Sequence, residues 1–223
     1  MAKNKQHSTS GVVVIGLGRF GKSLALELMA QDAEVLGIDG DAKVVQGLAG
    51  RLTHVAQADS TDEDAMRQLS VHEFDRAVIG VGTDLEASIL SASVVLTLGV
   101  PNVWAKAISH SHARILTQIG VHHVVRPEHD MGRRVAHLVR GRMLDYIEFD
   151  DGYAIVKTTP PRLMHGRALE ESRPRSKFGV TIVGIKRTGQ DFVNAVPATV
   201  VQAGDLLIVS GPRQEVERFS ELT

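Results

Sequence analysis

A glycine motif close to the start of the chain limits the possible folds more than any other feature. An apolar run at 11–15 leads directly into Gly-Leu-Gly-Arg-Phe-Gly at 16–21, and an amphipathic run to Ala30 follows. In such a strand–turn–helix, Gly16 permits the tight turn, Gly18 lets the backbone approach a pyrophosphate, and Gly21 lets helix and strand pack closely. The free N–H groups at the helix start face the anion. The segment therefore predicts a dinucleotide-type fold.

A second expected strand at 34–38 ends on Asp39, which is placed to bond a ribose hydroxyl. Gly40 and Asp41 follow, so a 2′-phosphate would meet two carboxylates with no arginine nearby. This disfavours NADP and leaves NAD, ATP, ADP and AMP as candidate ligands. The alternative for Asp39 is a turn residue at a strand end, and the alternative for Asp41 is a helix N-cap.

Strands and helices alternate with steady spacing up to residue 125. The strands are short β-branched runs without clean alternation, as in a parallel sheet that is covered on both faces. We therefore expect an α/β, Rossmann-like, doubly wound parallel sheet of six strands. The expected strands are 11–16, 34–38, 53–57, 76–81, 102–105 and 121–125, and the expected helices are 19–31, 41–49, 62–69, 84–98 and 110–118.

The pattern changes in the last third of the chain, which predicts a small α+β domain. Expected strands are 145–149, 153–157, 180–186 and 206–209, a short helix covers 166–171, and a final helix covers 213–222. A helix with proline at its first position precedes them. The expected organisation is a disordered tail at 1–10, a nucleotide-binding domain at 11–126, a linker helix at 127–144 and a C-terminal domain at 145–223.

Polar residues and glycines follow the third and fourth expected strands. Asp59 and Ser60 follow one strand and Gly82 lies after the next. Open α/β sheets bind ligands at the carboxyl ends of their strands, so the first two are candidates for an adenine edge, and Gly82 leaves room for the ring. The alternative is that Ser60, Thr61 and Asp84 only cap the following helices.

Three charged residues are candidates near the phosphates. Arg19 lies in the first turn of a helix, where a cation opposes the macrodipole unless an anion is close. Lys106 follows the fifth strand and is a second phosphate candidate, and Glu128 suits a cation that bridges phosphates. The alternatives are a solvated arginine, an exposed loop lysine and a glutamate that only favours the helix dipole. The full set of candidate nucleotide-binding residues is Gly16, Gly18, Arg19, Phe20, Gly21, Asp39, Asp41, Asp59, Ser60, Gly82 and Lys106, with Glu128 as the candidate metal ligand.

Composition excludes several other classes. The polar start predicts no signal peptide, and no apolar run approaches the roughly 20 residues that span a bilayer, so we expect a cytoplasmic protein. Without cysteine there is no disulfide or thiolate chemistry. A net charge of −1 and basic residues at 133–142 that alternate with apolar ones predict no nucleic-acid binding. The ten histidines lack metal-ligand spacing, and no nucleophile elbow is present.

The ordered motifs resemble the RCK family, the regulators of potassium conductance, and especially its cytosolic KtrA/TrkA-type subunits. The motifs that support this resemblance are the glycine segment, Asp39, Asp-Ser-Thr at 59–61, Val-Trp-Ala-Lys at 103–106 and Pro-Glu-His-Asp-Met-Gly at 127–132, together with Lys-Phe-Gly-Val-Thr-Ile at 177–182.

The resemblance implies a regulator without catalysis. It implies pairing through the N-terminal domains, an octameric ring, and a separately encoded potassium-translocating membrane subunit of the KtrB/TrkH type that keeps the ring at the inner face of the membrane. ATP replacing ADP or NAD would change the ring's shape, with Asp39 on ribose, Arg19 on the terminal phosphate in the neighbouring subunit, and Glu128 on a divalent cation or sodium.

Two further possibilities complete the expectations. Some relatives bind cyclic di-AMP in the C-terminal domain, and Arg175, Phe178 and Pro197 stand near the matching region. The alternative function is an NAD-dependent oxidoreductase, which needs a general acid or base and a substrate pocket that the sequence does not reveal.

Overall fold

The computed structural model describes residues 11–140 and 143–222. These residues form two compact units, the first ending at Glu128 and the second beginning at His129, and each unit is described by itself. The tail expected at 1–10 lies outside the described residues.

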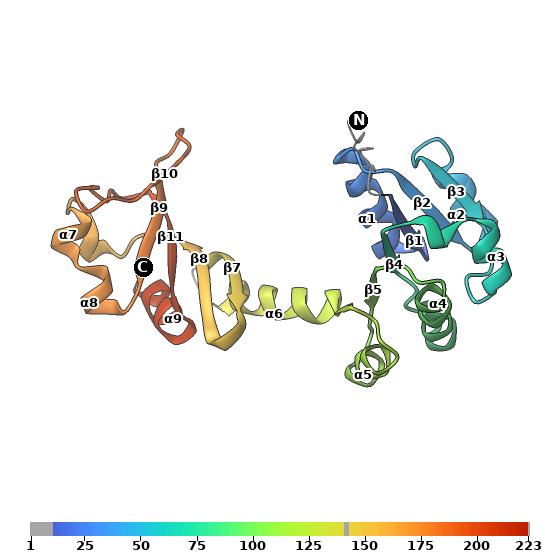
Figure 1. Ribbon diagram of the computed structural model, residues 1–223. Coiled ribbons are helices and arrows are strands. Elements are labelled where there is room, and N and C mark those ends of the chain that lie inside the picture. Colours follow the sequence, from blue (N-terminus) through green and yellow to red (C-terminus); the bar gives the residue numbers. More distant parts are fainter. Residues whose placement is uncertain (1–10, 141–142, 223) are drawn as a thin grey trace, which may run out of the picture. The chain divides into compact units, whose positions relative to one another are not determined.

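The first unit is built on a six-stranded parallel sheet, as expected (Figure 1). Its order is β3-β2-β1-β4-β5-β6, so the strand order reverses at β1, between β2 and β4. A crevice forms outside the carboxyl ends of strands at such a reversal. The strands are β1 (Val12–Ile15), β2 (Val35–Asp39), β3 (His54–Gln57), β4 (Arg76–Ile79), β5 (Asn102–Lys106) and β6 (His123–Val125).

Helices cover both faces of this sheet. Alternate residues of β1 enter two different cores, because successive strand side chains point to opposite faces. Val12 and Val14 pack in a core with Ala25 of α1, whereas Val13 and Ile15 pack in a second core with helices from the rest of the unit. The helices are α1 (Arg19–Ala30), α2 (Ala42–Leu48), α3 (Glu63–Gln68), α4 (Leu85–Thr97) and α5 (His110–Gln118), with a 3₁₀ turn η1 (Val71–Glu73).

The second unit is an antiparallel sheet with short helices. Its strand order is β10-β9-β11-β8-β7, and Val216 and Phe219 of the last helix are fully buried in its core. The strands are β7 (Met143–Phe149), β8 (Tyr153–Thr158), β9 (Thr181–Lys186), β10 (Phe192–Asn194) and β11 (Leu206–Pro212). Helix α6 (Pro127–Arg140) starts with the last two residues of the first unit and continues in the second. The other helices of the second unit are α7 (Leu169–Ser172), α8 (Pro174–Phe178) and α9 (Arg213–Glu221), with 3₁₀ turns η2 (Asp150–Gly152) and η3 (Arg162–Met164).

Several local expectations differ from the structure in this second part of the chain. Met143, expected in the linker helix, starts β7 because it pairs with Thr158 across the sheet. The helix expected at 166–171 begins only at Leu169. Sequence patterns missed α8 and β10, since both are very short and all three residues of β10 are exposed.

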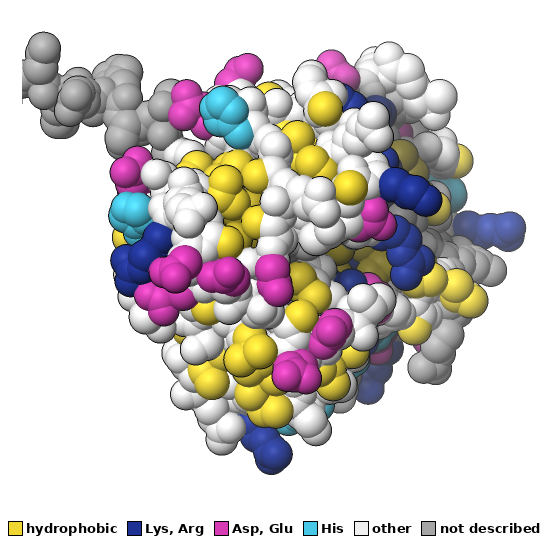
Figure 2. Space-filling view, turned by 90° about the vertical axis from the view of Figure 1, so that its right-hand side faces the viewer, with side chains coloured by type: hydrophobic (Ala, Val, Ile, Leu, Met, Phe, Trp, Pro, Cys, Tyr) yellow, Lys and Arg dark blue, Asp and Glu magenta, His cyan; other side chains and the backbone are white. Residues whose placement is uncertain are grey.

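Two features concern contact with a membrane and with nucleic acid. Among residues 11–140 and 143–222, no helix has the length and apolar character needed to cross a membrane. On the face shown in Figure 2, acidic side chains run across the middle and most basic ones lie toward the rim. That face therefore offers no continuous basic surface of the kind that binds nucleic acid.

Candidate nucleotide-binding site

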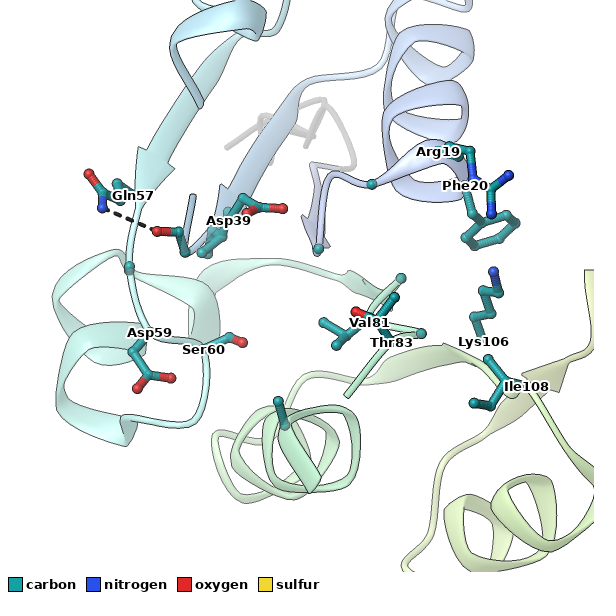
Figure 3. A pocket seen from close by; sticks show the side chains of 18 of the residues that line it. Arg19, Phe20, Asp39, Gln57, Asp59, Ser60, Val81, Thr83, Lys106 and Ile108 are labelled. Atoms are coloured by element: carbon teal, nitrogen blue, oxygen red, sulfur yellow. Dashed lines mark hydrogen bonds between the residues drawn. The ribbon is translucent and has the colours of Figure 1, made fainter. Parts of the chain in front are cut away.

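A cavity of about 860 Å³ opens where the sheet's strand order reverses (Figure 3). Its volume lies in the range of small-molecule sites. Most of the residues singled out in the sequence line it, although they come from different strand ends. These are Gly16, Gly18, Arg19, Phe20, Asp39, Asp59, Ser60, Gly82, Lys106 and Glu128. Gly21 and Asp41 are not among the lining residues.

The start of α1 faces this cavity without a side-chain cap. Its N-cap is Gly18, which has no side chain to accept a bond, and the first turn of the helix contains no acidic residue. By contrast, a side-chain oxygen caps each of α2, α3, α4 and α5. The unsatisfied N–H groups and the positive end of the macrodipole favour an anion at this point.

Asp39 connects the glycine turn to the end of β2. Its Oδ2 accepts a hydrogen bond from the backbone N–H of Leu17 at 2.7 Å, and its Oδ1 accepts one from that of Asp41 at 2.9 Å. A carboxylate has about four acceptor positions, so both oxygens retain capacity for ribose hydroxyls. Asp39 therefore orders the turn and still presents acceptors to the cavity.

Asp41 caps a helix, which is the alternative to nucleotide binding that its sequence position offered. It is the N-cap of α2, where its Oδ1 accepts from the backbone N–H of Lys43 at 2.8 Å. Its inclusion among the nucleotide-binding residues is therefore not supported by its position. Gln57, which sequence reasoning missed, does line the cavity, and its Nε2 donates to the carbonyl of Gly40 at 3.1 Å (Figure 3). The available signal was its place at the carboxyl end of a parallel strand.

Asp59 and Ser60 form the side of the cavity that follows β3. Asp59 accepts from both the backbone N–H and the hydroxyl of Thr61, at 2.9 and 2.7 Å, which lowers the pKa of the carboxyl. The hydroxyl of Ser60 bonds that of Ser91 in α4 at 2.7 Å.

The alternative that Ser60 and Thr61 cap the next helix is wrong, because Asp62 does so. Asp84 caps α4, as its alternative stated.

Lys106 and Glu128 form an ion pair at the edge of the cavity. The Nζ of Lys106 lies 2.5 Å from the Oε1 of Glu128 and 5.7 Å from the centre of the Phe20 ring. Figure 3 shows Lys106 pointing toward Phe20. The hydrogen bond from Lys106 lowers the pKa of Glu128, and the charge of Arg19 contributes less.

Within 11–140 and 143–222, no three His, Asp or Glu side chains group closely enough to hold a metal.

His112 is a buried titratable group behind the site. It is 2% exposed, its Nδ1 accepts from the N–H of Ile108, and burial lowers its pKa below 6.5. The unfolded chain therefore binds more protons than the folded one between the two pKa values, so stability falls as the pH drops below about 6.5.

We expect the His112→Asn variant to show a weaker loss of unfolding free energy between pH 7.5 and 5.5 than the wild type. A single group contributes at most about 1.4 kcal/mol per pH unit. Urea unfolding at both pH values measures the difference. His110→Asn, at an exposed position of the same helix, is the control, and an unchanged slope in His112→Asn would contradict the assignment.

The C-terminal candidates lie in the second unit, where each has a packing contact. Arg175 donates to the hydroxyl of Thr181, and the Phe178 ring meets that of Phe219 edge-on at 5.6 Å. The carbonyl of Pro197 accepts from the N–H of Glu170 at 2.9 Å. These contacts place the three residues within the second unit, and their role in binding a ligand stays a prediction.

Comparison with known proteins agrees with this architecture. The TrkA-N domain family matches residues 12–127, and the TrkA-C domain family matches residues 153–223. The Ktr system potassium uptake protein C of Bacillus subtilis is 35% identical over 93% of this chain and 95% of its own length. The Ktr system potassium uptake protein A of Vibrio alginolyticus is 34% identical over 91% and 93% of the two chains.

Solved structures share the fold at low identity. The GsuK RCK domain superposes with a TM-score of 0.67 at 16% identity, and a GsuK channel bound to NAD does so at 0.66 and 16%. They cover 99% and 100% of this chain, which spans 49% and 40% of theirs. The chain therefore belongs to the family of TrkA-N and TrkA-C domain proteins that includes the Ktr system potassium uptake proteins.

Proposed function

We propose that this chain is a cytosolic, nucleotide-binding regulatory subunit of a potassium uptake system. The observation that carries the proposal is the uncapped start of α1, which shares one cavity with Asp39 and Lys106. The relatives of near-equal length are named as potassium uptake proteins, which supports the transport context. In this proposal the chain assembles as a dimer-based octameric ring. The ring acts at the inner face of the membrane on a separately encoded, KtrB/TrkH-like potassium-translocating subunit.

The lining residues suggest how ATP, ADP or NAD lies in the cavity. The ribose binds at Asp39, the adenine lies toward Asp59 and Ser60, and the phosphates lie at the start of α1 near Lys106. Arg19 then reaches the terminal phosphate of a nucleotide held by the neighbouring subunit. ATP favours one ring shape only through contacts that ADP lacks, and Arg19 supplies such a contact.

A cation near Glu128 is the remaining part of the proposed site. Magnesium is typically held by one or two carboxylates together with substrate phosphates, so one glutamate is sufficient on the protein side. Cyclic di-AMP is the proposed ligand of the C-terminal unit. A thermal scan with ATP, ADP, NAD, NADH and cyclic di-AMP tests which of these ligands bind, because a ligand of the native state raises the melting temperature, and repeating the ATP scan with magnesium tests the cation.

We expect the Arg19→Ala variant to bind ATP at least about tenfold more weakly while its ADP affinity stays within about twofold. A hydrogen bond to a charged group is worth roughly 1.5–3 kcal/mol, and tenfold in Kd is about 1.4 kcal/mol. Calorimetry with each nucleotide provides the measurement. Lys22→Ala, an exposed cation on the same helix, is the control, and equal losses for both nucleotides would exclude this role for Arg19.

Regulation itself is tested in vesicles that contain the potassium-translocating membrane subunit. Adding this chain with ATP should change the potassium flux, and adding it with ADP should give a different flux. Flux that ignores both the chain and the nucleotide would contradict the proposal. The dehydrogenase alternative predicts substrate-dependent formation of NADH, which we do not expect.

A further inference from the structure

The ammonium group of Lys106 is enclosed on three sides. Its side chain is only 12% exposed, with the Glu128 carboxylate and the Phe20 ring as neighbours. A Cβ added at Gly82 would lie 3.5 Å from the Nζ of Lys106, so the glycine forms the third side. The cation is thus held in place, with Glu128 as its direct anionic partner.

Glu128 is the more exposed member of this pair. Its side chain is 66% exposed, and it lies at the start of α6, directly after Pro127. It lines the same cavity as the uncapped start of α1 and is close enough to Arg19 for that charge to act on it. A carboxylate therefore occupies one direction from which an anion would approach Lys106.

A carboxylate and a phosphate oxygen make the same kind of bond to an ammonium group. When both lie at Lys106, they repel each other, so each weakens the binding of the other. An anionic ligand at Lys106 therefore binds against the negative charge of Glu128, whether the carboxylate stays on the ammonium group or moves aside. A ligand can displace Glu128 from Lys106 only to the extent that its own interaction with Lys106 is more favourable than that of the glutamate.

We propose that Glu128 is an internal competitor for the phosphate-binding position at Lys106 and thereby sets the cavity's selectivity among anionic ligands. The proposal rests on the nucleotide site proposed above. If so, Glu128 lowers the affinity of any phosphate ligand that binds at Lys106 without a metal ion. A glutamate that served only as a cation ligand would instead leave metal-free binding unaffected.

The test is calorimetry of the full chain with ADP and with pyrophosphate, both in the presence of EDTA. We expect Glu128→Gln to bind both probes about three- to tenfold more tightly than the wild type, since the amide keeps the shape and removes the charge. The gain in affinity from Glu128→Gln should disappear in the Lys106→Gln background, because that substitution removes the cation for which the carboxylate and the phosphate compete. A double-mutant cycle measures this coupling. Glu63→Gln, which breaks the exposed pair with Arg67 in the same unit, is the control.

The outcomes separate this proposal from the one on which it rests. If the wild type binds ADP but Glu128→Gln binds metal-free ADP equally or less tightly, the competitor role is wrong and the nucleotide site stands. If Glu128→Gln still tightens binding when Lys106 is replaced, the effect is not competition at Lys106. If the wild type and Glu128→Gln bind ADP neither in EDTA nor with magnesium added, both proposals fail. Thermal unfolding of every variant shows whether it is folded.

Discussion

Replacing Gly21 by alanine should destabilise the first unit strongly. A Cβ at this position would lie 1.9 Å from the carbonyl oxygen of Gly16 and 3.0 Å from its carbon. That backbone has little freedom to move, because Gly16 has a φ of +83° and its N–H donates to the carbonyl of Ile38 at 2.8 Å. Overpacking costs roughly 1–3 kcal/mol or more, and we expect a loss of about 3 kcal/mol.

Gly18 is the matched control for Gly21 because it belongs to the same motif but has no steric constraint. Its φ is −62°, and no heavy atom outside Gly18 and its two chain neighbours lies within 4 Å of a Cβ built there. Gly18→Ala should therefore unfold like the wild type. Its methyl group enters the space next to the helix start, so ADP affinity should fall about tenfold or more.

Thermal or urea unfolding and calorimetry together distinguish the two glycines. A loss of about 3 kcal/mol corresponds to a fall of roughly 10 °C or more for a unit of this size. Wild-type stability of Gly21→Ala would show that helix and strand do not approach as the structure has them. Unchanged ADP affinity of Gly18→Ala would place the pyrophosphate elsewhere.

The second large effect is expected at Asp39. Asp39→Ala removes the proposed acceptors for the ribose and also the acceptor for the N–H of Leu17. Hydrogen bonds to a charged group contribute roughly 1.5–3 kcal/mol each, so we expect a loss of about 3 kcal/mol, or roughly 100-fold, in ADP binding. Calorimetry measures the binding, and urea unfolding measures the accompanying loss of stability.

Asp41→Ala is the control because Asp41 is two residues away and caps α2. Loss of an aspartate cap costs about 1 kcal/mol of stability. We expect ADP affinity to stay within about twofold of the wild type. If Asp41→Ala weakens ADP binding as much as Asp39→Ala, the loop as a whole and not Asp39 itself determines affinity.

The order of elements in the first unit could be predicted because its signals are local. The glycine spacing, the apolar strands and the cap of α4 at Asp84 each depend on neighbours in the chain. The same signals were insufficient in the second unit. β10 has three exposed residues and exists because it pairs with β9, a contact that no local pattern reveals.

The sequence alone therefore determined the parallel fold, the edge of the sheet where the cavity opens and most of the side chains that line it, since parallel strands bring their carboxyl ends together. The tertiary structure decided what each side chain does there. Ser60 bonds Ser91 in α4 instead of capping the next helix. Lys106 meets Glu128 because the end of β5 and the start of α6 converge although 22 residues separate them. Such contacts depend on distance in space, which spacing along the chain does not specify.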